Sequence, residues 1–227
     1  MRGLLAGAGA MLRRRRGQFL QANGGAFLRR ILSACRTAEV QPFLMYGTLL
    51  GFQRDGGFIQ GDSDIDLGLF AQDLSRLAQL KHAMRRDGMA LKHETFIDGT
   101  LWDVAFLHPQ VDLWVDFAII HMDGDRAVSR CYWGNDELLE SHFYPADLFA
   151  TFTTRSWYGE HVRVPENAEG LLQDLYGDWR VPAPSFDYRT GYANAVITRY
   201  ALPRWPRWRA KLARVRRLPR IARLIRT

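Results

Sequence analysis

The stretch YGTLLGFQRDGGFIQGDSDIDLGLF, residues 46–70, decides the fold of this chain. Its first residues predict a helix over 46–52, which is followed by a glycine-rich turn and then by the alternating run DIDLGLF. Successive side chains of a strand point to opposite faces, so this run predicts a strand with acids on one face and Ile65 and Leu67 on the other. The stretch therefore indicates a domain that mixes helices and strands.

The flanking sequence extends this pattern. We expect an amphipathic helix over 18–40, loosened by two glycines, and a second helix over 71–88 that ends at Gly88. Residues 100–120 predict two strands broken at Pro109 and Gln110, and residues 165–179 predict a further helix. This order predicts an α+β fold of α/β type, in which helices flank a small mixed sheet.

Composition places one domain between two basic ends. The chain has 227 residues and is 47% hydrophobic, enough for one buried core. Residues 1–36 carry eight arginines and no acid, and residues 203–227 carry ten basic residues and no acid. Of the 31 basic residues, 13 remain in 37–202 against all 24 acids, a net charge of −11. An acidic body argues against nucleic acid as a partner.

We therefore expect four segments. Residues 1–36 form a basic helical segment, 37–182 the folded domain, 183–202 a proline-marked linker and 203–227 a basic amphipathic tail. Cys35 and Cys131 predict neither a disulfide nor a zinc site, which suits a reducing compartment. No export signal and no run of roughly 18–20 apolar residues is visible, so we expect a cytoplasmic protein.

The candidate chemistry is carried by aspartates. Asp64 and Asp66 lie two apart in the predicted strand, with Cα atoms roughly 6.6 Å apart, and can converge on one site. Crowded carboxylates suit Mg²⁺ or Mn²⁺, which can stabilise phosphoryl transfer. Asp112 and Asp116 lie four apart in the second strand, so both are candidates for a third ligand. The six histidines show no metal-binding spacing.

The stretch over 46–70, with VDLW at 111–114 and VPENAEGLLQDLYGDW at 164–179, resembles the signature of the LicD and fukutin-related family. The resemblance covers about residues 43–180 and implies a nucleotidyltransferase fold. It also implies roles for individual residues: metal binding by Asp62, Asp64, Asp66 and Asp112, with Asp116 as the rival third ligand, catalysis by Asp64, Asp66 and Asp112, and substrate binding by Gly47, Thr48 and Arg54.

The same resemblance implies a reaction. Members of the family transfer phosphocholine, ribitol phosphate or a similar phospho-alcohol from a CDP-activated donor to a hydroxyl of a glycan or lipid-linked glycan, and release CMP. Two alternatives stay open: transfer of a whole nucleotide onto a protein, a small molecule or RNA, and a non-enzymatic protein that binds nucleic acid.

The basic tail over 203–227 pairs its arginines with apolar residues at roughly helical spacing. This composition favours an anionic membrane surface, and peripheral binding at the inner face of the membrane would bring the chain close to lipid-linked acceptors. A solvated basic tail and a nucleic-acid tether are the alternatives.

Overall fold

The computed structural model describes residues 2–133, 137–183, 186–188 and 191–200. Its helices are α1 (Arg2–Thr37), α2 (Tyr46–Leu50), α3 (Leu77–Arg86) and α4 (Ala168–Tyr176). Its strands are β1 (Phe43–Leu44), β2 (Asp64–Phe70), β3 (Ala90–Ile97), β4 (Thr100–His108), β5 (Leu113–Asp123), β6 (Arg126–Trp133), β7 (Leu138–Pro145), β8 (Phe152–Trp157), β9 (Glu160–Pro165) and β10 (Ala195–Arg199). A π-helical turn (Gly51–Asp55) follows α2, and 3₁₀ turns (Ala71–Arg76 and Ala146–Phe149) precede α3 and β8. The expected tail over 203–227 lies outside the described residues.

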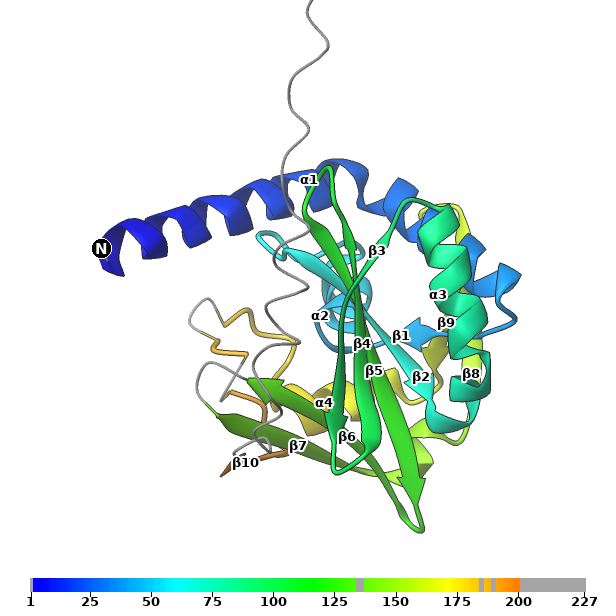
Figure 1. Ribbon diagram of the computed structural model, residues 1–227. Helices are drawn as coiled ribbons and strands as arrows, with labels where there is room; N and C mark the ends of the chain where they lie inside the picture. Colours follow the sequence, from blue (N-terminus) through cyan, green and yellow to red (C-terminus); the bar gives the residue numbers. More distant parts are fainter. Residues whose placement is uncertain (1, 134–136, 184–185, 189–190, 201–227) are drawn as a thin grey trace, which may run out of the picture.

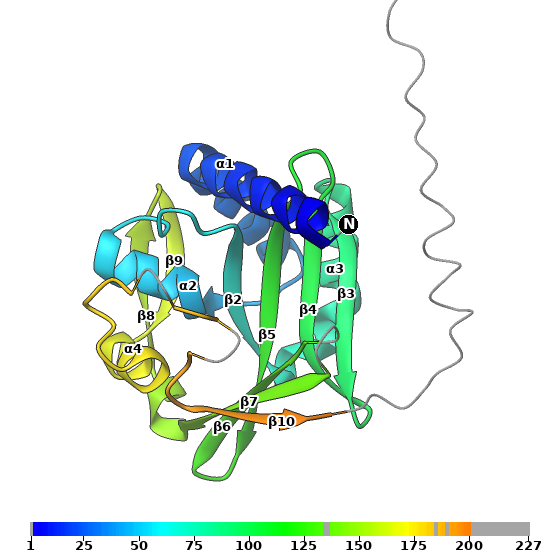
Figure 2. The ribbon, with the colours of Figure 1, turned by 90° about the vertical axis from the view of Figure 1, so that its left-hand side faces the viewer.

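The strands of the described chain form one mixed sheet around β5. Its path runs β10-β7-β6-β5-β2-β1-β9-β8, and β4 joins β5 to β3 as a branch. The beginning of β5 lies between β2, in parallel, and β4, in antiparallel, whereas its end pairs with β6. Figure 2 shows β6, β7 and β10 turning away below the other strands. The predicted mixed sheet is confirmed, although ten strands make it larger than expected.

The core joins the sheet to α1 and α3. Helix α1 contacts α3, β2 and β5, and Figure 2 shows it crossing the ends of β2, β5 and β4. Its Leu20, Leu28 and Ile31 belong to the same hydrophobic cluster as Ile65 and Phe117. From Leu20 onward, α1 therefore shares the core of the domain. Among the described residues, no helix is long and apolar enough to cross a membrane.

Several expected elements hold and others need correction. The strand over 64–70 and the break between β4 and β5 are confirmed. The helix expected from residue 18 already begins at Arg2, and its glycines pack tightly: a Cβ on Gly24 would lie 2.4 Å from the Phe58 ring. The linker expected over 183–202 is wrong in its last part, because β10 forms there and pairs with β7.

Candidate functional site

One face of the sheet carries a row of polar side chains. The register pairs Asp66 with Asp116, Asp116 with Ala105 and Ala105 with His93, so these residues lie side by side across β2, β5, β4 and β3. Register partners point to the same face of a sheet. The alternate residues of β2, among them Ile65, are fully buried on the opposite face. The pleat thus separates an acidic face from an apolar one.

The acids on this face gather into two groups. Asp62, Asp64 and Asp66 each offer an oxygen within 4.8 Å of the others, and Asp116 does the same with Asp103 and His93. The second group contains a contact of 2.6 Å between His93 Nε2 and Asp103 Oδ2. His93 thus joins a candidate metal-binding group through partners on two other strands, which the spacing of the histidines in the sequence does not indicate.

The carboxylates repel one another and have lost much of their water. Burial, followed by the charges of Asp64 and Asp62, raises the pKa of Asp66 well above its usual range. Burial also raises the pKa of Asp62, and the Asp64 charge adds to this shift. The pKa of Asp116 is raised by burial first and then by Asp103 and Asp64. Such crowding is relieved by a cation between the carboxylates.

Gly47 and Thr48 hold β2 against the start of α2. The Gly47 N–H donates to Asp66 Oδ2 at 3.1 Å, and the Asp66 N–H donates to Thr48 Oγ1 at 2.8 Å. A Cβ on Gly47 would lie 2.9 Å from Asp62 Oδ2 and 3.1 Å from Asp66 Oδ2, so the site needs a glycine here. Thr48 is fully buried and contacts the backbone of β2, which gives it a positioning role.

The structure brings Asp116, and not Asp112, beside Asp66. Asp112 precedes β5 in a turn with φ of 54° and forms an ion pair with Arg16 of α1. Its carboxylate is therefore already paired and does not belong to either acidic group. This geometry favours Asp116 over Asp112 as the third carboxylate. The VDLW pattern is uninformative about register, and register decides which acid faces Asp66.

Arg54 is held by its neighbour Asp55. Its Nε and Nη2 donate to the two oxygens of Asp55 at 2.8 and 2.9 Å. The side chain is 15% exposed, and the hydrogen bonds from Arg54 lower the pKa of Asp55. Arg54 thus lies in the π-helical turn after α2, and its role in binding donor phosphate stays a prediction.

Two basic residues that the sequence did not single out border the acidic face. The guanidinium of Arg16 lies 4.3 Å from the centre of the Trp114 ring, and the ammonium of Lys92 lies over the same ring. Trp114 is the register partner of Asp64. Burial lowers the pKa of Lys92 to about 8, against the opposing effect of Asp116. No sequence spacing reveals this pair, because α1 and β3 meet only in the folded chain.

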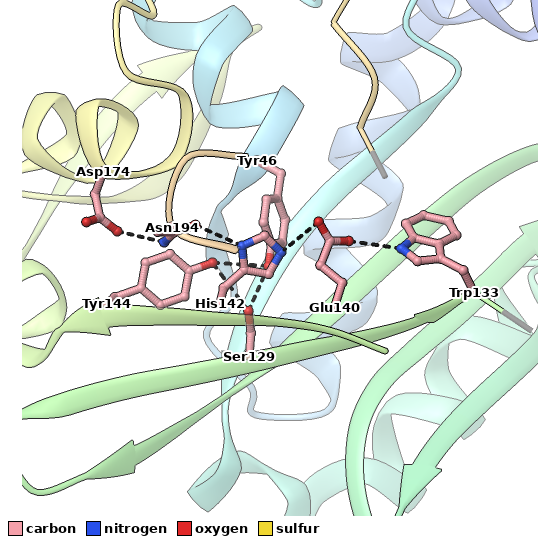
Figure 3. A network of polar contacts seen from close by, with 8 residues as sticks. All are labelled: Tyr46, Ser129, Trp133, Glu140, His142, Tyr144, Asp174 and Asn194. Atoms are coloured by element: carbon pink, nitrogen blue, oxygen red, sulfur yellow. Dashed lines mark hydrogen bonds and ion pairs between the residues drawn. The ribbon is translucent and has the colours of Figure 1, made fainter. Parts of the chain in front are cut away.

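A polar network fixes the start of α2 from the other side of the site (Figure 3). Tyr46, whose φ is 45°, directs its hydroxyl to Ser129 Oγ at 2.8 Å and to the Tyr144 hydroxyl at 3.1 Å. The network also contains His142 and Glu140, both about 1% exposed, with 3.6 Å between Nε2 and Oε1. The strained Tyr46 backbone is held by these contacts, which position the Gly47 N–H.

The acidic face fits a hard divalent cation. Asp116 Oδ1 is buried and has no hydrogen-bond partner among the described residues. Oxygen donors on Asp62, Asp64, Asp66 and Asp116 are the ligands that Mg²⁺ and Mn²⁺ prefer. The residues present therefore suit a metal of this class.

The mixed sheet brings together aspartates from β2, which Gly47 and Thr48 hold in place, and from its parallel neighbour β5. This arrangement defines a domain of the nucleotidyltransferase class. The chain belongs to the family described as LicD/FKTN/FKRP, nucleotidyltransferase domain, whose model matches residues 39–167. The match covers more than half of the chain and includes every aspartate of the acidic face. The resemblance noted in the sequence is thereby confirmed.

Curated relatives include the ribitol 5-phosphate transferase FKRP of Homo sapiens and of Mus musculus. Each is 32% identical to this chain over 92 residues, which are 38% of this chain and 19% of the relative. The chain thus spans about a fifth of the length of the curated relatives it matches.

Two solved structures of the antibiotic-resistance factor ANT(2'')-Ia are also similar. The crystal structure with adenylyl-2''-tobramycin is 14% identical with a TM-score of 0.44, and covers 74% of this chain and 83% of that chain. The solution structure is 15% identical with a TM-score of 0.46, and covers 76% of this chain and 80% of that chain. The assignment of the fold rests on the family match.

Proposed function

We propose that the chain transfers a phospho-alcohol group, such as phosphocholine or ribitol phosphate, from a CDP-activated donor to a glycan hydroxyl, with release of CMP. The gathering of Asp62, Asp64, Asp66 and Asp116 on one sheet face carries this proposal. The family membership supports it, as does the ribitol 5-phosphate transferase named among the relatives.

The proposed roles follow from the positions of the side chains. Asp64, Asp66 and Asp116 bind Mg²⁺ or Mn²⁺, and Asp62 completes the carboxylate group. A bound metal of this kind neutralises charge on the donor pyrophosphate. The Gly47 N–H orients Asp66, and the hydroxyl of Thr48 keeps β2 at the distance that this contact requires.

The proposed reaction exchanges one phosphorus–oxygen bond for another. The acceptor hydroxyl attacks the phosphorus that carries the alcohol, and the bond between this phosphorus and the CMP oxygen breaks. An aspartate of the acidic face accepts the proton of the hydroxyl. CMP leaves with the electron pair of the broken bond.

Proposed partners and location complete the hypothesis. The acceptor is a glycan or lipid-linked glycan, and the tail over 203–227 binds an anionic membrane surface at its cytoplasmic side. Nucleic acid is not a proposed partner, since the body of residues 37–202 has a net charge of −11.

A donor assay tests the function. The chain is incubated in Mg²⁺ with labelled CDP-choline, CDP-ribitol or ATP and a panel of glycan acceptors, and Asp64→Asn serves as the inactive control. We expect CMP release together with label on the acceptor. Nucleotide on the acceptor would instead support nucleotidyl transfer and contradict the proposal. Equal product from the wild type and from Asp64→Asn would remove the acidic face from the reaction.

A further inference from the structure

Lys92 occupies a β-bulge at the edge of the acidic face. The ladder between β3 and β4 pairs Leu91 with Phe106 and His93 with Ala105, so Lys92 is the additional residue between them. A bulge interrupts the alternation of side chains and can turn a residue toward the face that regular pairing would deny it. Here the bulge directs Lys92 over the ring of Trp114, beside Asp64.

Lys92 is a cation without an ion pair among the described residues. Its charge interacts with those of Asp116, Asp103 and Asp64, yet none of them comes within ion-pair distance. A lysine of the same region, Lys81, is by contrast paired with Glu94. Lys92 therefore retains its hydrogen-bond donors for a ligand.

Arg16 approaches the same ring from α1 and is held in place. Its Nε donates to Asp112 Oδ2 at 2.9 Å, Nη2 contacts the same oxygen, and the side chain is 13% exposed. Asp112, left outside the acidic groups, thus has a place in the structure as the anchor of Arg16. Two cations converge on Trp114, one anchored and one free.

The balance of charge identifies the ligand of these cations. A divalent ion would offset part of the negative charge of the aspartates, and none of the described carboxylates lies within ion-pair distance of Lys92. Phosphate oxygens match such a pair, because lysine binds phosphate as a point charge and arginine through its planar donors.

We propose that Lys92 and Arg16 form a phosphate-binding subsite between β3 and α1, at the edge of the acidic face. The identity of the phosphate rests on the proposed function: it is either the transferred phosphate of the donor or a phosphate carried by the acceptor. The alternative is that Lys92 only offsets the aspartates, in which case its removal leaves phosphate binding unchanged and strengthens Mg²⁺ binding.

The experiment measures binding by calorimetry in saturating Mg²⁺. Wild type, Lys92→Met, Arg16→Gln and the control Arg14→Gln, an exposed arginine of the same helix, are titrated with CDP, CMP and inorganic phosphate. Because Lys92→Met removes a charge-assisted hydrogen bond, we expect this variant to bind the phosphate-containing ligand at least roughly tenfold more weakly than the wild type. Melting curves of each variant show that the fold is kept.

The two sources of phosphate give different patterns. If the donor supplies it, Lys92→Met weakens CDP and leaves CMP unchanged. If the acceptor supplies it, Lys92→Met binds CDP and CMP as the wild type does, but its binding of inorganic phosphate is lost. The subsite would be overturned if Lys92→Met bound CDP and phosphate with wild-type affinity. It would also be overturned if Arg14→Gln lost as much affinity as Lys92→Met. If the wild type binds no cytidine nucleotide, the proposed function fails, and the phosphate titration alone decides the subsite.

Discussion

At the scale of single residues, the carboxylates of the acidic face are costly to the folded chain in the absence of a cation. Burial raises the pKa of both Asp64 and Asp66, and the charges of Asp64 and Asp62 raise that of Asp66 further, so folding disfavours their ionised forms. Asp64→Asn or Asp66→Asn should therefore keep the unfolding free energy or raise it by about 1 kcal/mol in EDTA. Transfer in Mg²⁺ should fall by roughly 10²-fold or more.

Urea unfolding in EDTA and the donor assay measure these two effects. Magnesium should stabilise the wild type in proportion to its occupancy and have little effect on either variant. A variant that unfolds much earlier than the wild type would show that the carboxylate has a structural role. Activity at the wild-type level would show that it has no part in transfer.

The third carboxylate is a separate residue-scale prediction. Asp116 is the register partner of Asp66, whereas Asp112 is paired with Arg16. Asp116→Asn should lose transfer as fully as Asp66→Asn, because it removes an oxygen from the acidic face. Asp112→Asn should change transfer by less than about tenfold and stability by about 0–1 kcal/mol, the range of a partly exposed ion pair. The reverse order of activities would restore Asp112 as the ligand.

At the scale of elements, the junction of α2 and β2 is the most constrained part of the site. Gly47→Ala would place a methyl group 2.9 Å from Asp62 Oδ2 and 3.1 Å from Asp66 Oδ2, so the carboxylates of Asp62 and Asp66 must shift. We expect roughly 10²-fold lower transfer and a weaker thermal shift with Mg²⁺, while the melting temperature in EDTA stays close to wild type.

Gly68→Ala, in β2, provides the matched contrast. Its Cβ would lie 2.2 Å from the Phe43 ring, in the core, so this variant should lower stability by about 1–3 kcal/mol. Its thermal shift with Mg²⁺, compared at a temperature where it is folded, should be kept. If Gly47→Ala loses stability and keeps the response to Mg²⁺, the close contact at Asp62 does not control metal binding.

The buried pair on β7 predicts two opposed pH effects. Burial raises the pKa of Glu140 from 4.5 to about 7, so the folded chain holds an extra proton and loses stability as pH rises through this window. Burial lowers the pKa of His142 from 6.5 to about 4, so the unfolded chain holds the extra proton and stability falls as pH drops through that window. Between about 4.5 and 6.5 the two effects cancel.

Glu140→Gln separates them. The unfolding free energy of this variant, relative to wild type, should rise from pH 4.5 to 7 and reach a plateau of about 3 kcal/mol, since one pKa unit corresponds to 1.36 kcal/mol. The unfolding free energy of the variant itself should increase from pH 4 to 6.5, because the titration of His142 is then no longer opposed by that of Glu140. Urea titrations from pH 4 to 8 measure both, and a difference between variant and wild type that does not depend on pH would refute the effect.

Sequence reasoning reached the elements whose periodicity is local. The run at 64–70 showed its strand and its acidic face, and Pro109 showed the break before β5. It missed β1, β3 and β6–β10; of these, β6 and β10 lack clean alternation of buried and exposed side chains. The choice between Asp112 and Asp116, the bulge at Lys92 and the grouping of His93 with Asp103 all depend on register and on long-range pairing, which no spacing in the sequence fixes.

At the scale of the whole molecule, charge is distributed very unevenly. Residues 37–202 have a net charge of −11, and 203–227 carry ten basic residues and no acid. The acidic body is repelled by an anionic surface, so attraction to such a surface must come from the ends of the chain. Residues 203–227 hold the larger share of this basic charge, so their deletion should strongly weaken binding to vesicles that contain anionic lipid and leave transfer to a soluble acceptor unchanged.

Composition of the tail allows electrostatic attraction to be separated from apolar insertion. A variant with serine in place of Leu212, Val215, Leu218, Ile221 and Ile225 keeps every basic residue. At low salt it should still bind, since each basic residue contributes about 1 kcal/mol near the surface. At roughly 0.5 M salt, where screening shortens the reach of charge, it should dissociate while wild type stays bound through its apolar residues. If the wild type and the deletion variant sediment equally with anionic vesicles, the tail has no membrane role. If competing nucleic acid preferentially releases the wild type from the vesicles, nucleic acid is the favoured partner of the tail.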